Sequence, residues 1–129
     1  MKRDIQLERK LLFEIEGKYE AGQGWLFDHE INIEGYTKSV IAEHCKLLYS
    51  QGLINEYKED RYIGGSFDFQ IGNLSAHGYD YLELIRKDSV WEKTIEKIEE
   101  ENLPKTVETL ARIAGTIIGN AAKEFFGVP

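Results

Sequence analysis

The residues best able to bind a ligand lie on one side of a predicted helix over residues 37–51. At 100° per residue, its polar side chains fall opposite an apolar arc, and two further cations follow in a turn-rich segment. Lysine and arginine bind phosphate or guanine, and hydroxyl groups donate to phosphate oxygens. This is the chemistry of a helix that enters the major groove of DNA, with a neighbouring turn on the DNA backbone. The candidate DNA-binding residues are Lys38, Ser39, Lys46, Tyr49, Lys58 and Arg61.

The same surface carries features that oppose DNA binding. Glu43 shares the polar face of the helix, and this face has no arginine, asparagine or glutamine. Glu59 and Asp60 stand beside Lys58 and Arg61 and largely cancel their charge. The alternatives are a solvated helix face or a surface that binds protein, and the sequence leaves them open.

Metal binding and catalysis have little support in the sequence. His29, His44 and His77 are far apart, with no pair at a ligand interval, and Cys45 is the single cysteine. His44 and Cys45 fall within the apolar arc of helix 37–51, where a hydrogen-bonded core histidine and an inert thiol are normal. Phosphate-binding, nucleophile-elbow and zinc-protease motifs are missing. We expect no metal, no cofactor and no enzymatic activity.

Composition predicts a soluble globular protein that has no excess of positive charge for binding nucleic acid. The chain has 129 residues, is 42% hydrophobic and 30% charged, and carries a formal net charge of −7. Residues 1–73 hold nine Lys/Arg against thirteen Asp/Glu. Any DNA binding should therefore be weak without a specific site, with a shallow salt dependence. We find no signal peptide and no apolar run that could span a bilayer, and we expect a cytoplasmic location.

The first half of the chain reads as helix, strand, helix and hairpin. Asp4 can cap a helix that reaches about Gly17, and alternating apolar residues predict a strand over 25–33. Thr37 can cap helix 37–51, and Gly52 can end it. A hairpin follows, with residues 66–71 as its second strand; its turn lies at Gly64-Gly65 or at residues 58–61.

The second half reads as three helices. Ser75 can cap the first, and Ser89 with Glu92 forms a capping-box pattern for the second. Pro104 suits the start of the third, over residues 104–126.

Helix 104–126 has an apolar face wider than one neighbouring helix usually covers. This predicts burial in a homodimer interface or between two elements. Gly115 and Gly119 would permit close helix packing, and binding to a membrane surface is a weaker alternative because the polar face has few cations. The candidate interface residues are Leu110, Ile113, Ala114, Ile117, Ile118, Ala121 and Phe125.

Helix 37–51, then Gly52-Leu-Ile54, then a hairpin is the order in which a winged helix-turn-helix passes from its third helix into its wing. We therefore predict an α+β, mainly helical fold: a winged helix over residues 2–87 and a C-terminal helical extension over 88–129. A separate second helix before residue 37 is missing, and a single turn or the strand takes its place.

Several motifs, spread over roughly residues 1–95, resemble a family of small bacterial and prophage proteins of unknown function with a winged-helix-like fold. They are Met1-Lys-Arg-Asp4, Leu11-Leu12 with Ile15, Ile33-Glu-Gly-Tyr36, His44-Cys-Lys-Leu-Leu48, Gly52-Leu-Ile54, Leu74-Ser-Ala-His-Gly78 with Leu82, and Arg86-Lys-Asp88 with Trp91. The Leu-Ser-x-x-Gly element also looks like that of winged-helix regulators of the multiple-antibiotic-resistance-regulator type. The resemblance implies a fold and a phage-linked context, and no catalytic residues.

The functional expectation is a phage- or mobile-element-associated regulator that binds double-stranded DNA as a dimer. The alternative is a winged helix that binds protein and not DNA.

Overall fold

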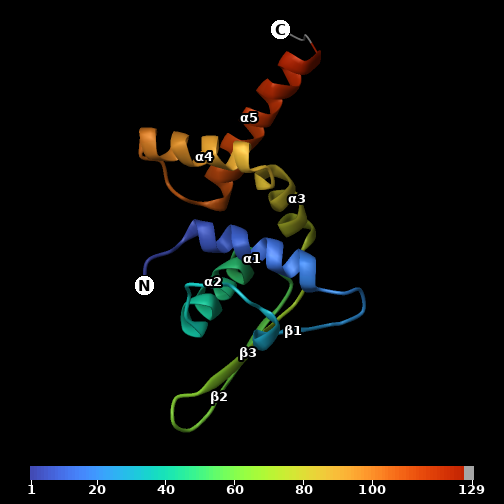
Figure 1. Cartoon of the computed structure of the whole chain (residues 1–129), viewed down its shortest axis with the longest axis vertical. Helices are drawn as coiled ribbons and strands as arrows, with labels where there is room; N and C mark the ends of the chain where they lie inside the picture. The colour runs from blue at the N-terminus through green and yellow to red at the C-terminus, as the bar shows by residue number, and fades with distance from the viewer. Residues whose placement is uncertain (127–129) are drawn as a thin grey trace. The chain divides into compact units, whose positions relative to one another are not determined.

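The computed structural model describes residues 1–126, with side chains through Lys123, and divides into two units, Met1–Tyr79 and Asp80–Pro129 (Figure 1). In this described part the fold is α+β and mainly helical, with five α-helices and one three-stranded antiparallel sheet. None of the helices among these residues is long and apolar enough to cross a membrane.

Helix α1 (Ile5–Lys18) begins where the sequence predicts. The Asp4 carboxylate accepts hydrogen bonds from the backbone N–H groups of Gln6 and Leu7, at 3.0 and 3.1 Å. Leu7, Leu11 and Ile15 are fully buried, so the predicted apolar arc forms the core side of the helix.

Helix α2 (Lys38–Ser50) also matches its prediction at both ends. Thr37 Oγ1 accepts from the Val40 N–H, and Gly52 has a left-handed φ of 74°. The Leu53 N–H bonds the Leu48 carbonyl at 2.9 Å, which completes a Schellman motif. The chain thus turns sharply from α2 toward the sheet.

The sheet has the order β1-β3-β2, with β1 (Leu26–Phe27) and β2 (Tyr57–Arg61) both antiparallel to β3 (Phe67–Ile71). Gly64 and Gly65 have φ of 97° and 91°, so the hairpin turns there and not at residues 58–61. In Figure 1 the hairpin extends away from α1 and α2.

The strand predicted over 25–33 was wrong beyond Phe27. Residues Asp28–Glu30 form one 3₁₀ turn, η1. The Asp28 carboxylate accepts the Phe69 N–H at 3.1 Å, and the Glu30 carboxylate accepts the Phe27 N–H at 2.8 Å. The two carboxylates thus accept backbone N–H groups that would bond to backbone carbonyls in a longer strand. The alternation of apolar residues does not show that side chains compete for these N–H groups.

His44 lies fully buried in the core between α1 and α2, as the sequence predicts for a core histidine. Its Nε2 accepts the Asp4 N–H at 2.9 Å, and its Nδ1 therefore carries the proton and donates to the Val40 carbonyl at 2.8 Å. Cys45 beside it is also fully buried, and burial raises the pKa of its thiol to about 12. Neither side chain is available for chemistry at the surface.

Helix α3 (Ala76–Ile85) starts at Ser75, whose hydroxyl accepts the Gly78 N–H at 2.9 Å and donates to the Gly52 carbonyl. A Cβ on Gly78 would stand 2.0 Å from the Leu53 carbonyl oxygen. The glycine is therefore required by the close approach of α3 to the backbone after α2.

In the second unit, α4 (Asp88–Glu101) packs against α5 (Val107–Phe126). The predicted cap at Ser89 was wrong by two residues. Lys87 is the N-cap, because the first helical bond runs from the Trp91 N–H to the Lys87 carbonyl. Helix α5 starts after Thr106, whose Oγ1 accepts the Thr109 N–H, so the predicted start at Pro104 was three residues too early. In Figure 1 the helix continues past α4.

Candidate interaction surface

We call the polar face of α2 together with β2, β3 and their turn the α2–hairpin surface. It carries all six candidate DNA-binding residues. Lys38, at the first turn of α2, reaches back to the sheet: its Nζ lies 3.1 Å from Asp28 Oδ2 and 3.5 Å from Asp68 Oδ1, and it also donates to the Phe67 carbonyl. Desolvation alone would lower the pKa of Lys38, but the two carboxylates together raise it. The Lys38 ammonium group is therefore bound by two carboxylates and a carbonyl of the same chain.

Lys46, two turns further along α2, is held in the same way. Its Nζ lies 2.9 Å from Glu59 Oε1 on β2 and 3.1 Å from Glu43 Oε1 on its own helix. Hydrogen bonds to these carboxylates raise the pKa of Lys46. The ammonium also lies 5.6 Å from the centre of the Tyr57 ring.

Glu59 is the centre of this contact. Besides Lys46, its carboxylate accepts from the Tyr57 hydroxyl at 2.8 Å and from Arg61 Nε at 2.6 Å. The Lys46 bond and the Tyr57 bond are the main reasons that the pKa of Glu59 falls from its ordinary value of 4.5 to about 2. The carboxylate is therefore charged at every physiological pH and is bound by two cations of the surface.

The charges of the α2–hairpin surface balance. Residues 38–50 and 57–71 contain four lysines and arginines and four aspartates and glutamates. Of these four cations, Lys58 alone has no carboxylate partner among the described residues. The surface is neutral overall and lacks a continuous basic stripe. Ser39 and Tyr49 are exposed, as the predicted polar face requires.

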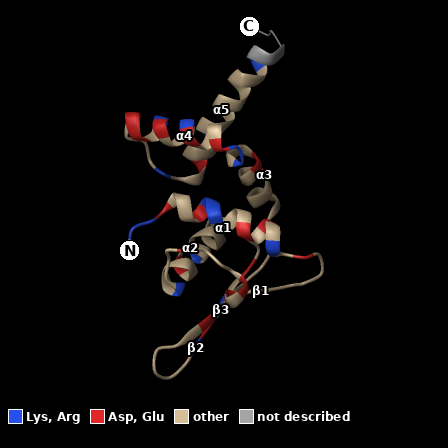
Figure 2. Ribbon diagram, viewed as in Figure 1, with Lys and Arg blue, Asp and Glu red and all other residues tan. Residues whose placement is uncertain are grey.

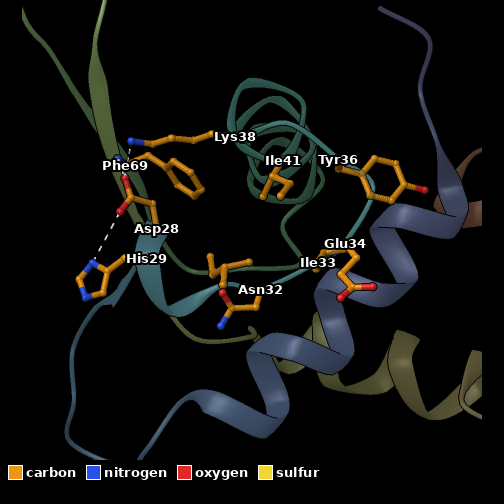
Figure 3. A pocket seen from close by; sticks show the side chains of 10 residues that line it. Asp28, His29, Asn32, Ile33, Glu34, Tyr36, Lys38, Ile41 and Phe69 are labelled. Atoms are coloured by element: carbon orange, nitrogen blue, oxygen red, sulfur yellow. Dashed lines mark hydrogen bonds and ion pairs between the residues drawn. The ribbon is translucent and has the colours of Figure 1, made fainter.

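A hollow of about 540 Å³ lies beside this surface, between η1, the segment before α2 and β3 (Figure 3). Its floor consists of buried Ile31, Ile41 and Phe69, and Asp28 and Lys38 close one end.

The Asp28 carboxylate at the end of this hollow is fully engaged. Burial alone would raise its pKa, but the hydrogen bonds from the Phe69 N–H and from Lys38 lower it below the ordinary value. His29 stands 3.7 Å from Asp28 Oδ1 at the exposed rim.

The charged groups at the end of this hollow are paired with each other, since Lys38 Nζ lies 3.1 Å from Asp28 Oδ2. The part of the chain that the structure describes contains no group of three His, Cys, Asp or Glu side chains that could hold a metal ion. The expected absences of enzymatic activity and of a cofactor stay predictions.

Residues 2–104 match the family described as "Hypothetical protein (DUF2513)". This match covers more than half of the chain. The chain belongs to the DUF2513 family. It is also 30% identical over 118 residues to a protein of Haemophilus influenzae described as uncharacterized, covering 92% of this chain and 96% of that protein. No solved structure matches the chain. The sequence resemblance to a family of unknown function is thus confirmed at this level, and the DUF2513 match ends before α5.

The turn of the hairpin in this DUF2513 chain exposes two large apolar side chains, and neither belongs to a site predicted from the sequence. Ile63 is fully exposed and Tyr62 is 51% exposed. The signal in the sequence was an isoleucine directly before Gly64-Gly65, in a turn where polar residues are usual.

The candidate dimer residues of α5 fall into three groups. Leu110 and Ala114 are buried within the chain, and Ile113 and Ile117 are half-buried. Ile118 and Ala121 are exposed, and Phe125 lies outside the described side chains. The apolar face is therefore partly used for packing in this DUF2513 chain, and the homodimer stays a prediction.

Proposed function

We propose that residues 1–79 form a winged helix in which the second helix is reduced to the single turn η1. The support is topological: α1, β1, η1, α2 and the hairpin β2–β3 follow in that order, and β1 pairs with the second strand of the hairpin. In a winged helix the first strand likewise joins the sheet beside the second strand of the wing. The hairpin is then the wing, and α2 is the helix that would read DNA.

We infer that this winged helix binds protein through the α2–hairpin surface and does not read DNA. One observation carries this proposal: three of the four cations of the surface are bound by carboxylates of the same chain, at 2.6 to 3.1 Å for the closest pairs. Phosphate binding would have to replace these contacts and would bring DNA beside Glu43, Glu59 and Asp68. With a net charge of −7, the rest of the chain adds no attraction at long range.

The second candidate is a DNA-binding regulator that acts as a dimer. The winged-helix topology and the exposed Lys58, which has no carboxylate partner among the described residues, favour it. The α5 face would supply the dimer contact that brings two reading helices to two half-sites. The link to phages or other mobile elements rests on the sequence resemblance alone.

Fluorescence anisotropy of a labelled random-sequence duplex at low salt separates the two candidates. We expect no binding by the wild-type chain. The Glu59→Gln variant should gain weak binding that salt abolishes, because it releases Arg61 and leaves Lys46 with Glu43 as its one carboxylate partner among the described residues.

The opposite result would support the regulator. Wild-type binding with a log–log salt slope of several units, lost in the Lys38→Ala/Lys46→Ala double variant, would mean that DNA displaces the internal carboxylates. The protein-binding proposal would then be wrong, and a search for an operator sequence would follow.

A further inference from the structure

The outer edge of β2 presents backbone groups that have no partner strand among the described residues, since the sheet order β1-β3-β2 leaves that edge open. The Phe69 N–H on β3 bonds the Asp28 carboxylate and therefore points away from β2. Glu59 stands opposite Phe69 in the β2–β3 register. Opposed residues of an antiparallel pair either bond each other or both point outward, so the backbone N–H and C=O of Glu59 also point away from β3. The same holds for Tyr57 and Arg61, two positions away on either side.

Two charges on this strand lack an opposite charge. Lys58 and Asp60 lie on the face of β2 opposite to that of Glu59, and both are exposed. Neither has an ion-pair partner among the described residues. Asp60 instead stands directly opposite Asp68 on β3, and like charges at opposed positions destabilise a strand pair. In Figure 2 the charged residues of the hairpin lie in its strands, and the turn has none.

A second β2 strand, running antiparallel, would satisfy the backbone groups and the charges in one register. With Glu59 opposite Glu59 of the second copy, the outward-pointing residues 57, 59 and 61 all meet and can exchange N–H···O=C bonds. Lys58 then stands opposite Asp60 of the second copy, twice, at positions where side chains approach most closely. The neighbouring registers with the same backbone bonds place Lys58 opposite Lys58 or Asp60 opposite Asp60. The charges therefore select this register and a second copy as the partner.

The other face of the paired strands is compatible with this register. Glu59 would meet Glu59 of the second copy there, but each carboxylate is already bound by Lys46 at 2.9 Å and by Arg61 at 2.6 Å. These two cations offset the repulsion between the carboxylates. Tyr57 would lie opposite Arg61 of the second copy, a pair that allows a cation–π contact.

We propose that two copies of this chain join through antiparallel pairing of their β2 strands, with Glu59 at the two-fold axis. The contact is isologous, and it joins the two three-stranded sheets into one continuous sheet. It differs from a symmetric pairing of two α5 helices, because both contributing surfaces lie in the first unit. The inference rests on the proposed function, because it treats the hairpin as a protein-binding surface and names its partner.

The test is sedimentation velocity of the full chain, without DNA, from about 1 µM to about 500 µM. We expect concentration-dependent dimerisation of the wild type. Lys58→Asp and Asp60→Lys should each raise the dissociation constant at least about tenfold, because each variant places like charges opposite each other on both sides of the axis. An equimolar mixture of the two variants should dimerise again, since every lysine of one variant then faces an aspartate of the other. The double variant Lys58→Asp/Asp60→Lys should dimerise like the wild type for the same reason.

Lys93→Asp is the matched control for net charge, because Lys93 is exposed on α4 in the second unit, and this variant should dimerise normally. The backbone contact is tested separately at Arg61. Arg61→Pro removes an outward N–H and leaves the bonds to β3 in place, whereas Arg61→Ala keeps this N–H. The proline variant should lose dimerisation and the alanine variant should keep most of it, with circular dichroism to verify that both are folded.

A wild type that stays monomeric over this range would overturn the proposal and would mean that Lys58 and Asp60 protect the edge from pairing. Normal dimerisation of Lys58→Asp, a mixture of variants that does not dimerise, or equal dimerisation of Arg61→Pro and Arg61→Ala would also overturn it. Loss of association in Ile118→Glu with a normal Lys58→Asp would favour the predicted α5 dimer instead. DNA binding in the anisotropy assay would contradict the proposed function without affecting these measurements, so the two failures can be told apart.

Discussion

Two single residues, Gly78 and His44, each fit against a backbone group of the fold. Gly78 leaves room for the Leu53 carbonyl, and His44 accepts the N–H of Asp4 at the start of α1. Both act inside the fold of the first unit, so their roles are in stability and not in binding.

Gly78→Ala should reduce the free energy of unfolding by about 3 kcal/mol or more, because the new methyl group would meet a backbone oxygen that cannot move independently. Urea denaturation measures this loss. Gly119→Ala is the control: a methyl group at that position would have no neighbouring atom within 4 Å, and the substitution should stabilise α5 by about 0.5–1 kcal/mol. Equal effects of both substitutions would contradict the close approach of α3.

His44→Leu should lower the free energy of unfolding by about 2–3 kcal/mol, since it leaves the Asp4 N–H without its acceptor inside the fold. Thermal and chemical denaturation give the value. His77→Leu, at an exposed position on α3, should change stability by less than about 0.5 kcal/mol. A tolerated His44→Leu would mean that the two backbone bonds of the ring contribute little.

At the level of elements, carboxylates of the sheet and of η1 hold α2 in place. Asp28 and Asp68 bind Lys38 at one end of the helix, and Glu59 binds Lys46 further along. The hairpin and α2 are therefore joined through two of the lysines that the sequence suggested as DNA-binding residues.

The Glu59 contact predicts a defined pH dependence. The folded-state pKa of about 2 lies below the ordinary 4.5, so the stabilisation is complete above pH 4.5 and is lost as the pH falls toward 2. Glu59→Gln should be less stable than the wild type at pH 7, by roughly 1 kcal/mol, and this difference should vanish near pH 2. Denaturant titrations at several pH values test this. Glu56→Gln, an exposed glutamate just before β2, should retain the wild-type pH profile.

On the scale of the whole molecule, the salt dependence of self-association tests the predicted α5 dimer. A symmetric dimer of apolar α5 faces should keep its strength or gain strength as sodium chloride rises from about 0.05 to 0.5 M. Association through charged surfaces should weaken over the same range, because the Debye length shortens severalfold. Sedimentation velocity at a fixed protein concentration measures this response, and association that weakens with salt would contradict an apolar α5 contact.

Most of the helices and the hairpin could be predicted from the sequence, because their formation depends on local signals. Asp4, Thr37 and Ser75 were recognisable as caps, and the apolar arcs of α1 and α2 became the core. Predictions from local signals were wrong where a side chain bonded to a backbone N–H group that a strand would use. The strand after Phe27 was lost to side-chain bonds from Asp28 and Glu30, one of them to β3.

The ion pairs of the candidate site could not be predicted from the sequence, because they join residues that only the fold brings together. The spacing of Lys38 and Lys46 predicted one polar face, and that face is present, but the fold brings Asp28, Glu59 and Asp68 against it. Periodicity reports which side of a helix a residue occupies. It carries no information on which charge a distant strand places opposite, because that depends on the register of the fold.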